Sequence, residues 1–260
     1  MFRVAFRPQD RASTALFSSW LTLTLALVLL SGCKPDHELD CFKSTGKVTT
    51  TRRELAPIHT LTVFDNVDVT LVQDTATFAE VRTGQNLQED LELTEQDGSL
   101  TIRNTSRCNW VRRYDVPREV TVHLPTLLNL FQKGQNTVRT QGTFHAEKFF
   151  CHLVGAGDFD LQVDSRYLWL DLYELGDIRI TGRTDSLHLT LGGLGSVYAK
   201  DLTTRYSFVK INRATAGDAH LLVTEQLFGY HAGAGTIFYF GTPRKVDISV
   251  TGKGKVVKME

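Results

Sequence analysis

A pattern of about 20 residues occurs seven times in the second half of the chain, and it constrains the fold more than any other feature. Each copy is centred on a glycine, or once on an asparagine, at intervals of 21, 19, 19, 22, 18 and 19 residues. Apolar residues recur at fixed positions before and after each centre. The centres are Asn136, Gly157, Gly176, Gly195, Gly217, Gly235 and Gly254. A fixed period of this length indicates a solenoid, in which each coil buries its apolar face on its neighbours.

Within one repeat the hydrophobic pattern is that of β-strands. Leu168, Leu170 and Leu172 alternate with other residues, and the next repeat does the same 19 residues later. An alternation with period 2 places one set of side chains on one face of a strand. Such a repeat is too short for a strand, a helix and a second strand. We therefore predict an all-β fold, a parallel β-helix with coils of about 20 residues. A β-sandwich built from hairpins is the alternative.

The alignment of the repeats also predicts which side chains point inward. It places Cys151, Leu189 and Ile211 at one buried position of successive coils, where Cys151 would act as a small apolar residue. It places His231 at another inward position, beside Arg213. We therefore expect His231 and Arg213 to form a polar pair.

Most repeats turn at a Gly-x-Gly-Asp segment or a variant of it. We expect its glycines to adopt positive φ and its aspartates to bond to their own backbone. Asp158, Asp177 and Asp218 recur at this turn. A calcium-binding β-roll uses a much shorter repeat that gives each ion several oxygen ligands. One aspartate in about 20 residues therefore favours a turn over a calcium site.

The first 32 residues have the features of a bacterial lipoprotein signal peptide. Arg3, Arg7 and Arg11 form a basic segment, and residues 16–30 form an apolar stretch shorter than a typical membrane span. The sequence Leu30-Ser31-Gly32-Cys33 resembles a lipobox, at which the signal peptide is cut before a cysteine that carries acyl chains. We expect acylated Cys33 to anchor the protein to a membrane. An ordinary secretory signal is the alternative.

The mature chain is predicted to start with a tether at 33–44, followed by one domain at 45–260. Lys34 rather than Asp follows the cysteine. By resemblance to Gram-negative lipoproteins, this indicates sorting to the outer membrane and leaves open which side the domain faces. Without residues 1–32, 26 basic and 28 acidic residues remain of 29 each, a net charge of −2. This balance indicates no nucleic-acid partner.

Three cysteines remain besides the acylation site, and Cys151 fits the core. Cys41 and Cys108 are the candidate pair for a disulfide, because an exported protein meets an oxidising compartment. Residues 47–104 are also rich in strands but less repetitive, with a turn at Asp97-Gly98. We expect them to form the opening coil and a hairpin-like cap over one end of the solenoid, which needs protection of its edge.

The chain resembles a known family in this region. The residues that carry the resemblance, together with the repeated glycine turns, are Cys41, Gly46, Arg53, Leu55, Leu61, Val63, Asn66, Val67, Asp68 and Val69. They look like the putative auto-transporter adhesin, head GIN domain family, over residues 45–256. The resemblance implies an exported, often lipid-anchored protein with a right-handed β-helix and no established activity. Asn136, Glu174 and Thr215 depart from the glycine pattern, so their corners should be built differently.

Aromatic residues at outward strand positions are the candidate binding site. In a parallel stack equivalent residues form ladders, and Trp169, Asp171 and Tyr173 form the predicted ligand-binding patch. The expected partner is a glycan or an envelope protein; coverage by a partner subunit or by the N-terminal segment is the other interpretation. We predict a binding module without catalytic residues, metal or cofactor, because His188, His220 and His231 occupy different repeat positions and no catalytic motif occurs.

A carbohydrate-active β-helix enzyme, such as a polysaccharide lyase or a glycosidase, is the alternative function. Glycoside hydrolysis uses two carboxylates on either side of the scissile bond. Asp160, Asp171, Glu174 and Asp177 are the outward acids that such an enzyme could use. A convergent pair of acids in a groove would favour the enzyme, and a flat aromatic ladder would favour the binding module.

Overall fold

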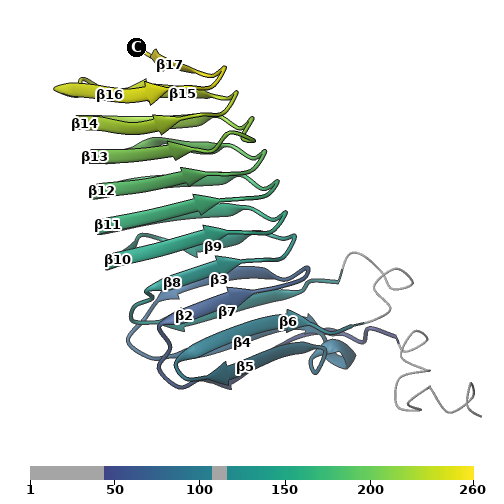
Figure 1. Ribbon diagram of the computed structural model, residues 1–260. Coiled ribbons are helices and arrows are strands. Elements are labelled where there is room, and N and C mark those ends of the chain that lie inside the picture. The colour runs from purple at the N-terminus through teal and green to yellow at the C-terminus, as the bar shows by residue number, and fades with distance from the viewer. Residues whose placement is uncertain (1–43, 107–115) are drawn as a thin grey trace, which may run out of the picture. The chain divides into compact units, whose positions relative to one another are not determined.

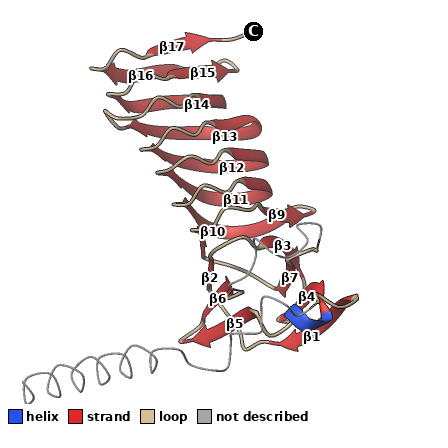
Figure 2. Ribbon diagram, turned by 90° about the vertical axis from the view of Figure 1, so that its right-hand side faces the viewer, coloured by secondary structure: helices blue, strands red, loops and turns tan. Residues whose placement is uncertain are grey.

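Five long parallel strands carry most of the repeats. The computed structural model describes residues 44–106 and 116–260. Figure 1 shows the long strands stacked above one another, one per coil, and Figure 2 shows them bending from one face to the next. Their bounds are β10 Phe144–Leu153, β11 Phe159–Leu172, β12 Ile178–Leu191, β13 Val197–Ile211 and β14 Ala219–His231. The predicted all-β parallel β-helix is confirmed, and the β-sandwich alternative is wrong.

The two halves of each long strand belong to different faces of the solenoid. The first half of β11 pairs with β9 (Val138–Gln141), and the second half of β10 pairs with β8 (Asn129–Gln132). Beyond β14 the halves separate again, because β15 (Thr236–Phe240) and β16 (Lys245–Val250) pair with its first and second half. The last strand, β17 (Lys255–Lys258), pairs with β15.

The alternation of apolar residues sets the inward face, as predicted. Leu170 pairs with Cys151 on one side and with Leu189 on the other, and all three side chains are fully buried. Trp169, one residue away, is only partly buried on the outer surface. Cys151 is therefore a core residue of the stack, as its repeat position indicated.

The predicted alignment is wrong at one coil. Val209, not Ile211, pairs with Leu189, and Ile211 pairs with Leu191. Relative to the 19-residue repeats, this 22-residue repeat has one extra residue in a bulge within β13 and two in the corner after the strand, so counting back from Gly217 shifts the end of the strand by two positions. For the same reason Arg213 is exposed in the corner and does not accompany His231, which lies buried in line with Ile211.

The glycines of the corners are needed for close packing and not for positive φ, contrary to the prediction. None of the seven repeat centres has a positive φ. A Cβ on Gly176 would overlap the carbonyl oxygen of Gly157, and the same holds for Gly195 on Gly176. The corners therefore stack backbone on backbone, a separation that only glycine permits.

The corner aspartates bond to the next coil and not to their own backbone, which corrects a second expectation. The backbone N–H of Asp177 donates to Asp158 Oδ1 at 2.8 Å, and that of Ser196 donates to Asp177 Oδ1 at 2.9 Å. The N–H of Thr236 donates to Asp218 Oδ1 in the same manner. These carboxylates therefore hold neighbouring coils together.

Antiparallel strands cover one end of the solenoid, as predicted. Figure 2 shows this cap below the regular coils. β4 (Phe78–Gly84) runs antiparallel to β1 (Val48–Glu54) and to β7 (Glu119–Leu124). β5 (Leu91–Gln96) and β6 (Ser99–Asn104) form a hairpin whose two turn residues, Asp97 and Gly98, both have positive φ.

The first coils do not stack in the order of the sequence. The opening coil consists of β2 (Thr60–Val63) and β3 (Asp68–Gln73). It pairs with β6 and β7 on one side and with β8 and β9 on the other. The second coil therefore lies on the capped side of the first, and the third coil starts the regular stack.

Candidate functional site

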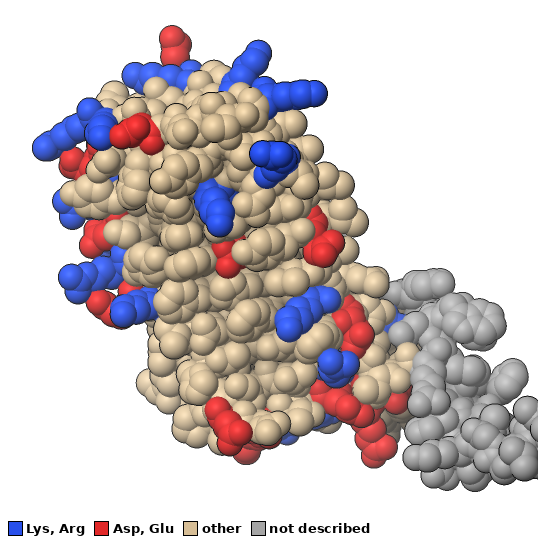
Figure 3. Space-filling view, viewed as in Figure 1, with Lys and Arg blue, Asp and Glu red and all other residues tan. Residues whose placement is uncertain are grey.

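The outward side of the second halves of β10 to β14 forms a surface that we call the aromatic face. One column of paired residues crosses it and includes five partly buried rings. They are Phe150, Trp169, His188, Phe208 and Phe228. The neighbouring columns add three tyrosines, of which Tyr206 and Tyr230 are 40% and 61% exposed and Tyr167 is partly buried. Figure 3 shows few charged residues across the middle of the visible face of the coils.

The rings of the central column pack on one another. Trp169 and His188 stack with centroids 3.7 Å apart and planes within 10°, and His188 meets Phe208 at 4.7 Å. Phe208 continues the column to Phe228 at 5.5 Å, and Phe150 flanks Trp169 at 6.2 Å. Burial lowers the pKa of His188, because its position disfavours the imidazolium. Trp169 and His188 cover each other's ring faces where they stack. A partner could therefore contact mainly the edges of these two rings.

Asp171 is the centre of a hydrogen-bond network next to this column. Its carboxylate accepts a hydrogen bond from Trp169 Nε1–H at 2.7 Å. It also lies 2.8 Å from His152 Nδ1 and is hydrogen-bonded to Thr190. Burial alone would raise its pKa, but these hydrogen bonds outweigh burial and lower the pKa below its usual value. Asp171 is only 6% exposed, so it positions Trp169 and is a poor contact for a ligand.

The three residues of the predicted ligand-binding patch are therefore not equivalent. Trp169 and Asp171 are joined by a hydrogen bond, whereas Tyr173 lies at the following corner and is 43% exposed. The Tyr173 ring covers Gly192, where an added Cβ would come within 2.7 Å of Tyr173 Cδ1. Whether this patch binds a ligand stays a prediction, and Tyr173 is its most accessible member.

The histidines and corner acids give no metal site among residues 44–106 and 116–260. No group of three metal-ligating side chains is found there. His220 lies between the rings of Tyr198 and Phe238, at 5.3 and 4.8 Å. His231 is fully buried, with Nε2 2.8 Å from the carbonyl oxygen of Gly235. Each histidine thus has a packing role of its own.

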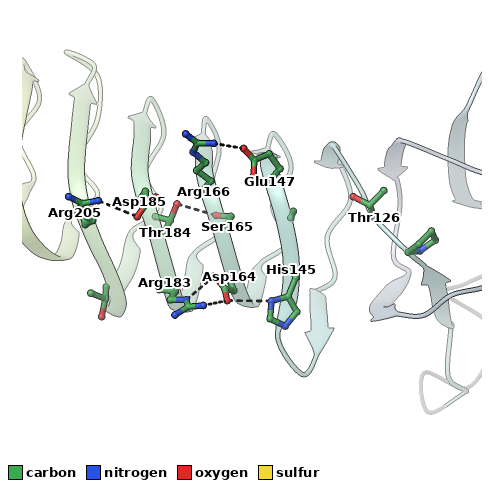
Figure 4. A pocket seen from close by; sticks show the side chains of 13 residues that line it. Thr126, His145, Glu147, Asp164, Ser165, Arg166, Arg183, Thr184, Asp185 and Arg205 are labelled. Carbon is green, nitrogen blue, oxygen red and sulfur yellow. Dashed lines mark hydrogen bonds and ion pairs between the residues drawn. The ribbon is translucent and has the colours of Figure 1, made fainter.

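A groove follows the bends of β10 to β13, at the edge of the aromatic face. Figure 4 shows its side chains rising on both sides of a floor that contains Ser165 and Thr184, whose hydroxyls are hydrogen-bonded at 3.1 Å. Its main chamber has a volume of about 750 Å³. Two smaller chambers share its walls, one of about 550 Å³ beside Tyr167 and Tyr206 and one of about 450 Å³ beside Gly182.

The walls of this groove alternate in charge from coil to coil. One wall has Glu147, Arg166, Asp185 and Arg205 in register, with Arg166 bonded to Glu147 at 3.1 Å and Arg205 3.9 Å from Asp185. The other wall has the residues His145, Asp164 and Arg183. Figure 3 shows Lys, Arg, Asp and Glu gathered along one edge of the coils.

Asp164 contacts both other charged residues of the second wall. Arg183 donates two hydrogen bonds to its carboxylate, at 2.9 and 2.7 Å, and His145 Nδ1 lies 3.4 Å away. The hydrogen bonds from Arg183 lower the pKa of Asp164. This groove was not predicted from the sequence, although charges of opposite sign recur there at the period of the coil.

The predicted lipidation and disulfide residues Cys33, Cys41 and Cys108 lie outside the described residues. Cys151 is free and buried, and burial raises the pKa of its thiol well above the usual range. Within residues 44–106 and 116–260, no helix has the length and hydropathy of a membrane span. The predicted anchor therefore stays a prediction.

Comparison with solved structures supports this architecture. A putative adhesin from Bacteroides fragilis NCTC 9343 is 19% identical, with a TM-score of 0.75 over 82% of this chain and 97% of its own. A putative adhesin from Parabacteroides distasonis ATCC 8503 is 20% identical, with a TM-score of 0.64 over 82% and 98%. A putative lipid binding protein from the same organism is 18% identical, with a TM-score of 0.61 over 84% and 98%. At these identities the likeness concerns the fold.

The family comparison covers most of the solenoid. No curated protein matches the chain. Residues 58–243, from just before the opening coil to the end of the corner after β15, match one family model. The chain therefore belongs to the family described as putative auto-transporter adhesin, head GIN domain.

Proposed function

We propose that this protein is a binding module of the bacterial cell envelope, without enzymatic activity, that holds a glycan or an envelope protein against its aromatic face. The aromatic face carries this proposal. Large apolar surfaces that stay partly exposed mark interaction sites, and tyrosines combine apolar area with a hydroxyl group. Tyr230 and Tyr206 are its most exposed aromatic residues, and both belong to columns of paired strand residues.

The environment of Asp171 supports binding over catalysis. The carboxylate of Asp171 receives hydrogen bonds from His152, Trp169 and Thr190, and its pKa is lowered. A glycosidase acid must hold a proton near neutral pH and therefore needs a raised pKa. The pKa of Asp171 is shifted in the opposite direction, so Asp171 does not suit the role of the general acid.

The family relationship fits the same proposal. Two solved relatives in fold are named putative adhesins and one a putative lipid binding protein, and each name refers to binding. For this chain we propose an outer-membrane lipoprotein of a Gram-negative bacterium, held by acylated Cys33 through the tether at 33–44. Many anchored copies would then raise the strength of contacts that are weak one by one.

The test measures attachment of the purified domain, without residues 1–33, to glycan arrays and to isolated envelope fractions. We expect Tyr230→Ala and Trp169→Ala to weaken attachment, since one aromatic contact contributes about 0.5–1.5 kcal/mol beyond buried area. Thr181→Ala, on the outward side of the other half of β12, is the matched control and should leave attachment unchanged.

The enzyme alternative is tested on the same material. Release of reducing ends or unsaturated sugars from a polysaccharide, lost in Asp171→Asn, would show that the domain is an enzyme. Equal attachment by all three alanine variants would contradict the aromatic face as the binding surface.

A further inference from the structure

A slot between two tyrosines opens from the charged groove. Tyr167, Ser186 and Tyr206 are paired residues of β11, β12 and β13, so they stand in one outward column. Ser186 is small and leaves a gap between the two tyrosines, which are two coils, about 10 Å, apart. This gap is lined by both tyrosines and Ser186 and forms the chamber of about 550 Å³.

A separation of two coils leaves room for a single sugar ring between the tyrosines. Apolar contacts form at about 3.5–4 Å between carbon atoms, so a ring that touches both tyrosines needs about 7–8 Å. Among the described residues no aromatic ring packs on Tyr206, and the guanidinium carbon of Arg205 lies 5.4 Å from its ring centroid. At 40% exposure, Tyr206 is accessible from solvent.

The charges around the slot select the class of ligand. Glu147, Arg166, Asp185 and Arg205 alternate in sign along its wall, and Lys148, which pairs with Tyr167, adds a third positive charge at one end. The carboxylates would repel a polyanion, and the guanidinium groups would repel a polycation. Neither kind of ligand is therefore favoured along the whole wall. Carboxylates accept and guanidinium groups donate two hydrogen bonds side by side, which suits neighbouring hydroxyl groups.

The wall also has unused hydrogen-bonding capacity where it meets the slot. Arg205 and Asp185 approach only to 3.9 Å, which is too far for a hydrogen bond. Both side chains are 53% exposed. Exposed ion pairs of this kind contribute at most about 1 kcal/mol each, so a ligand can replace them at low cost.

We propose that the groove binds an uncharged, hydroxyl-rich glycan along the solenoid axis, with one sugar ring held between Tyr167 and Tyr206 over Ser186. Asp185 and Arg205 hydrogen-bond its hydroxyl groups, and Glu147 and Arg166 contact the next unit. This site is separate from the central column of the aromatic face. It rests on the proposed function only in that both require a binding module.

The test uses the full chain in detergent micelles and titrates short neutral oligosaccharides, namely gluco-, manno-, xylo- and galacto-oligosaccharides, and uronate oligosaccharides for comparison. We expect the wild type to bind at least one neutral set. Ser186→Tyr fills the slot with the residue type that its column already contains and should weaken binding about tenfold or more. Asp185→Asn keeps the shape, removes the charged acceptor and should also weaken binding.

Thr181→Tyr is the control, because it adds the same side chain to an outward, exposed position in the other half of β12. It should bind like the wild type. Thermal unfolding of each variant shows that it is folded; if Ser186→Tyr does not fold, Asp185→Asn decides. Failure of the wild type to bind any neutral set, a preference for uronates, or full binding by the decisive variant would overturn the proposal.

The aromatic face and the groove are distinguished by their variants. Loss of neutral glycan binding in Ser186→Tyr, with full binding in Tyr230→Ala, assigns the glycan to the groove. Loss of envelope attachment in Tyr230→Ala alone assigns a partner to the aromatic face and leaves no role for the slot in that contact.

Discussion

At Gly176, the lack of a Cβ atom allows two neighbouring coils to approach closely. Its corner lies against the carbonyl oxygen of Gly157, and the next corner repeats the contact. The sequence marks these positions by their period, but it does not show why glycine is required there. A turn with positive φ and a close approach of two backbones both call for glycine, and only the coordinates distinguish them.

Asp171 should make stability depend on pH. Its folded pKa is lowered, so it stabilises the fold at pH values above its unfolded pKa and loses this contribution as the pH falls through the folded pKa. Asp171→Asn should lower stability at neutral pH by about 1–3 kcal/mol, because an amide leaves at least one buried donor without an acceptor. Thermal unfolding from pH 7 to pH 3 is the measurement. Wild-type and variant curves that stay parallel in acid would contradict this role of Asp171.

The strands of the solenoid have two sides with different tolerance to charge. Leu170 lies in a fully buried ladder and Trp169 on the outer surface. Leu170→Asp should cost several kcal/mol, since it buries a charge without a partner. Trp169→Asp should cost less, because it loses ring packing but keeps the charge at the surface. Equal unfolding midpoints in denaturant would show that the assignment of the two sides is wrong.

Much of each strand could be predicted from the sequence, because alternation and period are local properties. The inward position of Leu170 follows from them, and the turn at Asp97 follows from the Asp-Gly pair, another local signal. The positions of the inserted residues could not be predicted, because the same spacing fits an insertion in the strand or in the corner. The structure has both, with one extra residue in a bulge of β13 and two in the corner after Ile211.

The candidate site was predictable only in part, for a related reason. The outward position of Trp169 follows from the alternation, but the burial of Asp171 depends on hydrogen bonds from three coils. The groove depends on the bend of the strands, which no residue pattern revealed. Because of this bend, side chains such as Arg205 line a groove, whereas on a flat sheet they would form an ordinary charged surface.

At the scale of the whole molecule, the anchor determines where the protein acts. Cys33→Ser should abolish labelling of the protein by palmitate and leave the precursor uncut, because the acylated cysteine is the predicted cleavage site. Metabolic labelling followed by membrane fractionation checks both effects. Cys151→Ser, at a buried core position, is the control and should retain the label. Unchanged labelling of Cys33→Ser would contradict the lipoprotein prediction.

The inverted order of the first coils has a consequence for synthesis. The opening coil lies between strands that come later in the chain, and its inner partner ends at Gln141. During synthesis from the N-terminus, the opening coil therefore has both of its neighbouring coils only after residue 141 has emerged. From β10 onward each new coil can add to a finished surface as soon as it emerges. Assembly during synthesis would therefore start once residue 141 has emerged and proceed away from the cap.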